Sequence, residues 1–81
     1  MKNERNNYRI ILTNTDNNKT MSFDVYCTPF SAKINTMDLR AAADRLVENN
    51  VFKAVIIDVW LTGEVLLEIN ECGEIVFDHL L

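Results

Sequence analysis

The chain has 81 residues, 48% of them hydrophobic and 25% charged, with two glycines and one proline. This length allows one domain with one modest core and excludes a second, and the composition excludes a disordered or low-complexity chain. The net charge of −4 is uneven: residues 1–50 carry seven Lys or Arg against six acids, whereas residues 51–81 carry one lysine against six acids. The C-terminal part should therefore repel nucleic acid and suit a basic protein surface.

Targeting and membrane signals are not recognisable in the sequence. The N-terminal residues contain no apolar run of signal-peptide length, and no stretch approaches the roughly 18 apolar residues of a membrane span. We therefore expect a cytoplasmic protein with no membrane partner, whose Cys27 and Cys72 are reduced thiols.

The first part of the chain predicts a β-hairpin. Residues 1–7 are polar and expected to be flexible. Residues 8–13 and 20–27 alternate between apolar and polar side chains, as half-buried strands do. The Asn- and Asp-rich residues 14–19 predict the turn between them. Four side chains of the second strand are expected to point inward: Met21, Phe23, Val25 and Cys27.

A helix is predicted to follow, because Pro29 should end the second strand and Asn35 is a good N-cap residue. Asn49 and Asn50 offer a left-handed stop. Arg40 and Asp44 are spaced to pair on the solvent side. The inward face of this helix is expected to consist of Leu39, Ala42, Ala43 and Leu46.

Residues 51–78 predict a three-stranded meander, rich in β-branched side chains and interrupted by two turns. A three-residue loop ending at Gly63, and another ending at Gly73, would place each glycine in the left-handed conformation. This register keeps one apolar face across all three strands. The expected pairs are Val59 with Val65, Ile57 with Leu67, Val55 with Ile69, Ile69 with Ile75, and Leu67 with Phe77.

The predicted order of elements is ββαβββ, a two-layer α+β domain with one helix packed on one face of an antiparallel sheet. The sequence does not determine where the first hairpin joins the meander.

No residue pattern predicts catalysis, a metal site or a cofactor. The chain has no C-x-x-C or H-x-x-x-H spacing, and its one histidine, His79, is three residues from the C-terminus. Gly63 and Gly73 are single glycines that precede strands, so neither forms a phosphate-binding loop. We expect a protein that is not an enzyme.

The face of the meander opposite its predicted core combines acids with apolar side chains. The predicted register places Trp60 opposite Glu64, Leu66 opposite Asp58, and Glu68 opposite Ile56. Two residues of the last strand, Val76 and Asp78, lie beside them. Exposed apolar side chains rimmed with one sign of charge mark contact sites, and Trp is a favoured anchor. We call these eight residues the predicted patch; the alternatives are a solvated charged face, or a face covered by another layer of protein.

These features predict a protein-binding inhibitor that covers a basic surface of its partner. In being small, acidic, asparagine-rich, single-domain and without catalytic residues, the chain resembles phage-encoded inhibitors of bacterial defence nucleases, such as anti-CRISPR proteins. That resemblance implies a nucleic-acid-binding defence enzyme as the partner. The alternatives are a homodimer formed through the same face or through the edge strand near Phe77, and an immunity protein or antitoxin.

Overall fold

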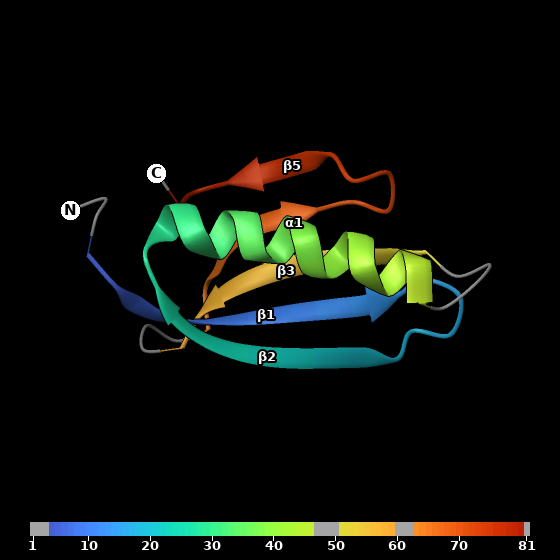
Figure 1. Cartoon of the computed structure of the whole chain (residues 1–81), viewed down its shortest axis with the longest axis horizontal. Helices are drawn as coiled ribbons and strands as arrows, with labels where there is room; N and C mark the ends of the chain where they lie inside the picture. Colours follow the sequence, from blue (N-terminus) through green and yellow to red (C-terminus); the bar gives the residue numbers. More distant parts are fainter. Residues whose placement is uncertain (1–3, 47–50, 60–62, 81) are drawn as a thin grey trace.

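The computed structural model describes residues 4–46, 51–59 and 63–80. Within these residues, five antiparallel strands form one sheet, and one helix lies across one of its faces (Figure 1). The elements are β1 (Asn6–Asn14), β2 (Thr20–Cys27), α1 (Pro29–Leu46), β3 (Phe52–Asp58), β4 (Val65–Ile69) and β5 (Ile75–Asp78). This arrangement confirms the predicted two-layer α+β fold and its ββαβββ order.

The strand order β2-β1-β3-β4-β5 places the first hairpin at one side of the sheet. Strand β1 pairs with β2 on one edge and with β3 on the other, so it is the strand that joins the hairpin to the meander. Asn6 and Asn7 already belong to β1, and residues 1–3, at the start of the segment predicted to be flexible, lie outside the described part.

The alternation predicted for the first hairpin is confirmed in β1, where Tyr8, Ile10 and Leu12 are buried. In β2, Met21 is 43% exposed at the start of this edge strand. Asn18 adopts a φ of 61° in the turn, as the asparagine-rich sequence predicted. Three side chains of β2 pack against the core: Phe23, Val25 and Cys27.

Helix α1 begins six residues before the predicted N-cap, so the choice of Asn35 was wrong. Thr28 caps the helix instead: its Oγ1 accepts a hydrogen bond from the backbone N–H of Ser31 at 3.3 Å. Pro29 occupies the first helical position, where a missing N–H costs nothing and the fixed φ suits the helix. The proline that ends β2 therefore also starts α1.

Small side chains let α1 lie close to the sheet. Ala32, Thr36 and Ala43 are buried, and the Thr36 hydroxyl donates a hydrogen bond to the Ala32 carbonyl oxygen at 2.7 Å. The predicted inward face is therefore correct for Ala43, only partly correct for Leu39, which is partly buried, and wrong for Leu46, which is 84% exposed. The helix is rotated so that its smallest side chains meet the strands.

The register between β3 and β4 differs from the predicted one. Ile56 lies opposite Leu67, and a β-bulge then shifts the pairing so that Ile57 lies opposite Val65. Strand β3 ends at Asp58 and β4 begins at Val65, so the strands are separated by more residues than the predicted three-residue loop. The predicted pairs of Val59 with Val65, Ile57 with Leu67, and Val55 with Ile69 are therefore wrong.

The two turn glycines behave as predicted, with φ values of 71° at Gly63 and 84° at Gly73. Ile69 pairs with Ile75 as expected. A second bulge then places Asp78 opposite Leu67, where Phe77 was predicted.

These shifts exchange the two faces of β3. Ala54 and Ile56 are 1% and 0% exposed beneath α1, whereas Val55 and Ile57 lie half-buried on the other face. Strand β3 is apolar on both sides, so a shift of one residue in its pairing inverts which side is the core. The predicted core face of β3 is therefore wrong, although Leu67 and Ile69 of β4 were assigned correctly.

Candidate protein-binding surface

The structure separates the eight residues of the predicted patch. Ile56 is fully buried and Asp58 is 5% exposed, because both lie on the helix side of β3. Leu66 sits at the bulge in β4 and packs partly against the core. Trp60 lies outside the described residues. The expectation that these side chains share one outward face is therefore corrected for Ile56, Asp58 and Leu66.

The other members of the predicted patch are exposed but do not lie together. Glu64, which directly precedes β4, and Glu68, which lies within β4, are both exposed. Val76 is 54% exposed on the edge strand β5. Asp78 forms an ion pair with Lys33 of α1, and the resulting hydrogen bond lowers the pKa of the Asp78 carboxyl. The ion pair of Asp78 therefore links the edge strand β5 to α1, on the face of the sheet opposite Glu68.

The face of the sheet that α1 does not cover carries apolar side chains from β1, β3, β4 and β5, with Glu68 among them. The register of the structure places Ile11 beside Val55, Ile57 beside Val65, and Glu68 between Val55 and Phe77. Figure 1 shows α1 on the opposite face only. Val65 and Phe77 are each 38% exposed. We call the five apolar members of this surface the open-face stripe: Ile11, Val55, Ile57, Val65 and Phe77.

A charged border surrounds the open-face stripe on the side of the first hairpin. Arg9 binds both carboxylate oxygens of Asp24 across β1 and β2, at 2.8 and 3.2 Å. The hydrogen bonds of this pair lower the pKa of the Asp24 carboxyl and raise that of the Arg9 guanidinium. Lys53 lies next to Thr13 at the far end of the same face. This side therefore carries two cations and one carboxylate.

The opposite side is acidic only. Between Gly63 and Leu80 the sequence has five acids and no Lys or Arg. In the described part of the chain, only Asp78 of these five takes part in an ion pair. The four others are exposed: Glu64, Glu68, Glu71 and Glu74. Glu64 precedes Val65 at the end of the open-face stripe, and Glu68 lies between Val55 and Phe77, so the stripe is exposed to negative charge.

Buried Tyr8 and Asp58 lie close to the partly buried Cys27. Desolvation by burial raises the pKa of the Cys27 thiol, and it raises the pKa of Tyr8 together with the nearby charges of Cys27 and Asp58. A thiol held protonated is a weak nucleophile. Cys72 is exposed in the β4–β5 turn, and both cysteines are free thiols. Among the described residues, no three His, Cys, Asp or Glu side chains come together as metal ligands.

The sequence contained a signal for the open-face stripe that the pairing argument missed. Along β3, the face of Val55 and Ile57 also includes Lys53, whereas the face of Ala54 and Ile56 begins with Phe52. Lys53, the second residue of this apolar strand, indicates the side that meets solvent. The bulges at Leu66 and in β5, in contrast, have no recognisable sequence signal.

Comparison of the chain with protein-family models, with curated proteins and with solved structures finds no match. Within the described residues, no helix combines the length and the apolar character needed to cross a bilayer. The function is therefore inferred from the exposure, apolar character and charge of this surface.

Proposed function

We propose that this protein is a non-enzymatic binding protein that covers a basic surface of a partner protein with its open-face stripe and the adjacent acids. The observation that carries the proposal is the sheet face opposite α1, where Ile11, Val55, Ile57 and Val65 are neighbours and Phe77 follows beyond Glu68, with no second layer over them among the described residues. Contiguous exposed apolar surface with a polar rim is typical of protein contact sites.

The two parts of this surface have different roles in the proposed complex. The open-face stripe supplies the desolvated centre, in which Phe77 is the largest anchor. Glu64 beside the stripe and Glu68 between Val55 and Phe77 should accelerate the approach of a basic partner and disfavour acidic ones. The same acids repel phosphate, so direct binding of nucleic acid is not expected.

A partner that itself binds nucleic acid fits this chemistry, because its binding surface must be basic. Covering that surface would inhibit the partner without any catalytic step. The proposed class is therefore an inhibitor of a nucleic-acid-binding enzyme, acting in the cytoplasm, as in anti-CRISPR proteins. An immunity protein would cover the basic surface of a toxin in the same way, and it is the alternative within this class.

A homodimer is the second candidate, favoured by the exposed edge of the sheet. All four residues of β5 are exposed, and the outer edge of this strand has no neighbour in the sheet. Two copies could pair along this edge or stack through Phe77 and the rest of the open-face stripe. The net charge of −4 on each copy opposes such self-association.

Affinity capture from the source cell, followed by mass spectrometry, tests the proposal. Two variants serve as a matched pair: Val65→Asp places a charge on the open-face stripe, and Ile34→Asp places one on the solvent side of α1. The two side chains are 38% and 40% exposed, so both changes should leave the fold intact. We expect a basic protein to be captured by the wild type and by Ile34→Asp, but not by Val65→Asp.

Light scattering on the same three proteins separates the homodimer. A monomeric wild type that captures a basic protein supports the proposal. A dimer that Val65→Asp dissociates, with no other protein captured, would replace it with self-association.

A further inference from the structure

Two carboxylates lie within the strands on the sheet face opposite α1, among the residues that the structure describes, and they differ in what lies opposite them. Asp24 of β2 lies opposite Arg9, whose guanidinium donates hydrogen bonds to both carboxylate oxygens at 2.8 and 3.2 Å. Glu68 of β4 lies opposite Val55 on one side and Phe77 on the other. The chain therefore supplies an arginine to the first carboxylate and apolar neighbours to the second.

The carboxylate of Glu68 is open to a cation from outside the chain. Glu68 is exposed, and within the described ranges it takes part in no ion pair. Lys53, two residues before Val55 on the same face, lies diagonal to Glu68 and is not paired with it. Residues directly opposite each other on antiparallel strands have Cβ atoms about 4.5–5.5 Å apart. Val55 and Phe77 therefore flank the Glu68 side chain closely.

Phe77 places an aromatic ring next to this carboxylate. The ring stacks on the imidazole of His79, with 4.5 Å between the centroids and 25° between the planes. Phe77 is nevertheless 38% exposed, so part of its ring is accessible from outside the chain. The face of an aromatic ring attracts a cation within about 6 Å of its centroid. Glu68 and Phe77, from adjacent strands, therefore attract the same kind of group.

A guanidinium group suits this pair of side chains better than an ammonium group does. Because a guanidinium is planar, it can donate two parallel hydrogen bonds to a carboxylate and also lie against an aromatic ring. The ammonium group of lysine is a compact, strongly hydrated charge without that geometry. The Arg9–Asp24 pair shows the two-bond arrangement on the same face of the sheet.

We propose that Glu68 and Phe77 form the binding site for one arginine side chain of the partner protein. The guanidinium donates two hydrogen bonds to the Glu68 carboxylate and packs against the accessible part of the Phe77 ring. This inference rests on the function proposed above, and it names the residue type by which the basic partner is recognised. A second copy of the chain is a poorer source of the arginine, because both copies carry a net charge of −4.

Titration of the ¹³C- and ¹⁵N-labelled full chain with hexa-arginine and with hexa-lysine tests the proposal, because the two peptides carry equal charge. We expect the side-chain signals of Glu68 and the ring signals of Phe77 to shift with hexa-arginine. The wild type should bind hexa-arginine about two- to fivefold more tightly than hexa-lysine, which is the value of one exposed cation–π contact.

Two variants remove the two parts of the site separately. Phe77→Leu keeps an apolar side chain and removes the ring, so it should bind the two peptides equally. Glu68→Gln keeps the size of the side chain and removes its charge. It should lose the preference as well, and it should bind hexa-arginine about two- to fivefold more weakly than the wild type. Both positions are exposed, and circular dichroism should give the wild-type spectrum for each variant.

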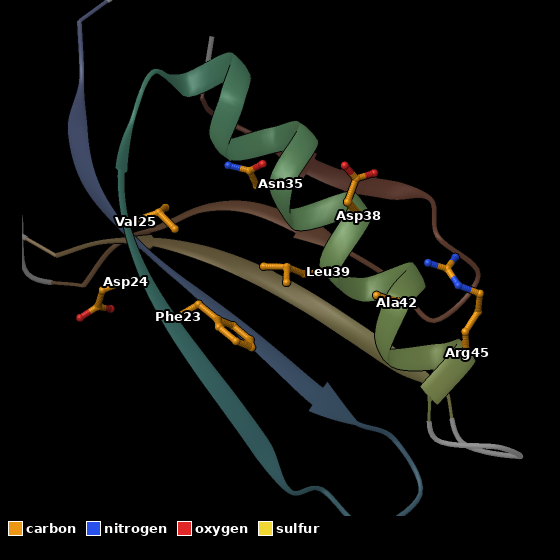
Figure 2. A pocket seen from close by; sticks show the side chains of 8 residues that line it. All are labelled: Phe23, Asp24, Val25, Asn35, Asp38, Leu39, Ala42 and Arg45. Carbon is orange, nitrogen blue, oxygen red and sulfur yellow. The ribbon is translucent and has the colours of Figure 1, made fainter.

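Asp38 provides a matched carboxylate on the other face of the sheet. It is exposed on α1, beside a hollow of about 630 Å³ between α1 and β2. Figure 2 shows it across this hollow from Phe23. Its neighbours one turn away on the helix, Ile34 and Ala42, are aliphatic, and in the described part of the chain Asp38 forms no ion pair. Asp38→Asn removes the same charge as Glu68→Gln and should keep the wild-type preference for hexa-arginine.

Four outcomes would overturn the proposal. They are equal binding of the two peptides by the wild type, a preference that persists in Phe77→Leu or in Glu68→Gln, and a preference that Asp38→Asn abolishes. The fourth is a wild-type dimer that Glu68→Gln dissociates, which would identify a second copy as the source of the arginine.

These titrations use no captured partner, so their failure is distinguishable from failure of the proposed function. Capture of a basic protein by the wild type but not by Val65→Asp, together with equal binding of the two peptides, would keep the proposed function and reject the arginine site. A preference for hexa-arginine that depends on Glu68 and Phe77, without capture of any protein, would support the arginine site and reject the proposed function.

Discussion

Two adjacent isoleucines of β3 provide a direct test of which face of the sheet is the core. Ile56 is fully buried between α1 and its neighbouring strands, whereas Ile57 is half-buried on the open face. The substitutions Ile56→Ala and Ile57→Ala remove the same atoms from the same strand. The difference between their effects therefore reports burial and not strand propensity.

The structure predicts that Ile56→Ala lowers the free energy of unfolding by about 2–5 kcal/mol, the usual cost of such a truncation in a core. Ile57→Ala should cost about 1 kcal/mol, because the side chain is already partly in water. A domain of this length has about 4–12 kcal/mol of stability in total. Ile56→Ala can therefore approach complete unfolding, and Ile56→Val, at about 0.5–1.5 kcal/mol, provides a milder version of the same test.

Urea titration followed by far-UV circular dichroism measures both values, with the slope of the transition compared between variants. The corresponding shift in Tm is about 4–8 °C for each kcal/mol in a domain of this size. An equal loss from the two alanine variants, or a larger one from Ile57→Ala, would refute the assignment of the faces and with it the open-face stripe.

Two further predictions concern the turns and the edge strand. Gly73→Ala should destabilise the protein more than Gly63→Ala. Both glycines have positive φ, so both substitutions strain the backbone. A Cβ at Gly73 would also lie 3.1 Å from Nη2 of Arg40, whereas a Cβ at Gly63 would meet no atom within 4 Å. Equal losses in thermal melts would exclude a role for the Arg40 contact. The hydrogen bond from Lys33 lowers the pKa of Asp78 in the folded state. This pair should therefore stabilise the fold at pH values above the unfolded pKa of about 3.9. The stabilisation should be lost as the pH falls through the lower pKa of the folded state. Asp78→Asn should therefore be less stable than the wild type at pH 7, and the two stabilities should converge in acid; a constant difference between pH 7 and pH 2 would contradict this account.

The sequence was sufficient to predict the order of elements, because alternation, turn residues and helix periodicity are local properties. Tyr8, Ile10 and Leu12 alternate cleanly, and Gly63 and Gly73 mark their turns. The pairing of Arg40 with Asp44 was also predicted correctly, with 2.8 Å between Nη1 and Oδ2. These features depend on residues that are near one another in the chain.

The tertiary details were not predictable in the same way. The Arg40–Asp44 pair does not lie on the solvent side: Arg40 also donates to the Phe52 carbonyl oxygen at 3.1 Å, and Asp44 accepts from the Phe52 N–H at 2.9 Å. The pair therefore fastens α1 to the start of β3. The bulges that set the register of β3 and β4 have no sequence signal, and Lys53 was the one residue that indicated the solvent side of β3. The resulting error relocated the candidate surface from Ile56 and Asp58 to the opposite face.

The central claim is that the open-face stripe contacts the partner, and methyl NMR of the isoleucine side chains measures this most directly. With the captured basic protein added to the labelled chain, Ile11 and Ile57 should shift or broaden, whereas Ile34 on α1 should not. Perturbation of Ile34 with unchanged signals from Ile11 and Ile57 would contradict the claim and place the contact on the helix side of the sheet.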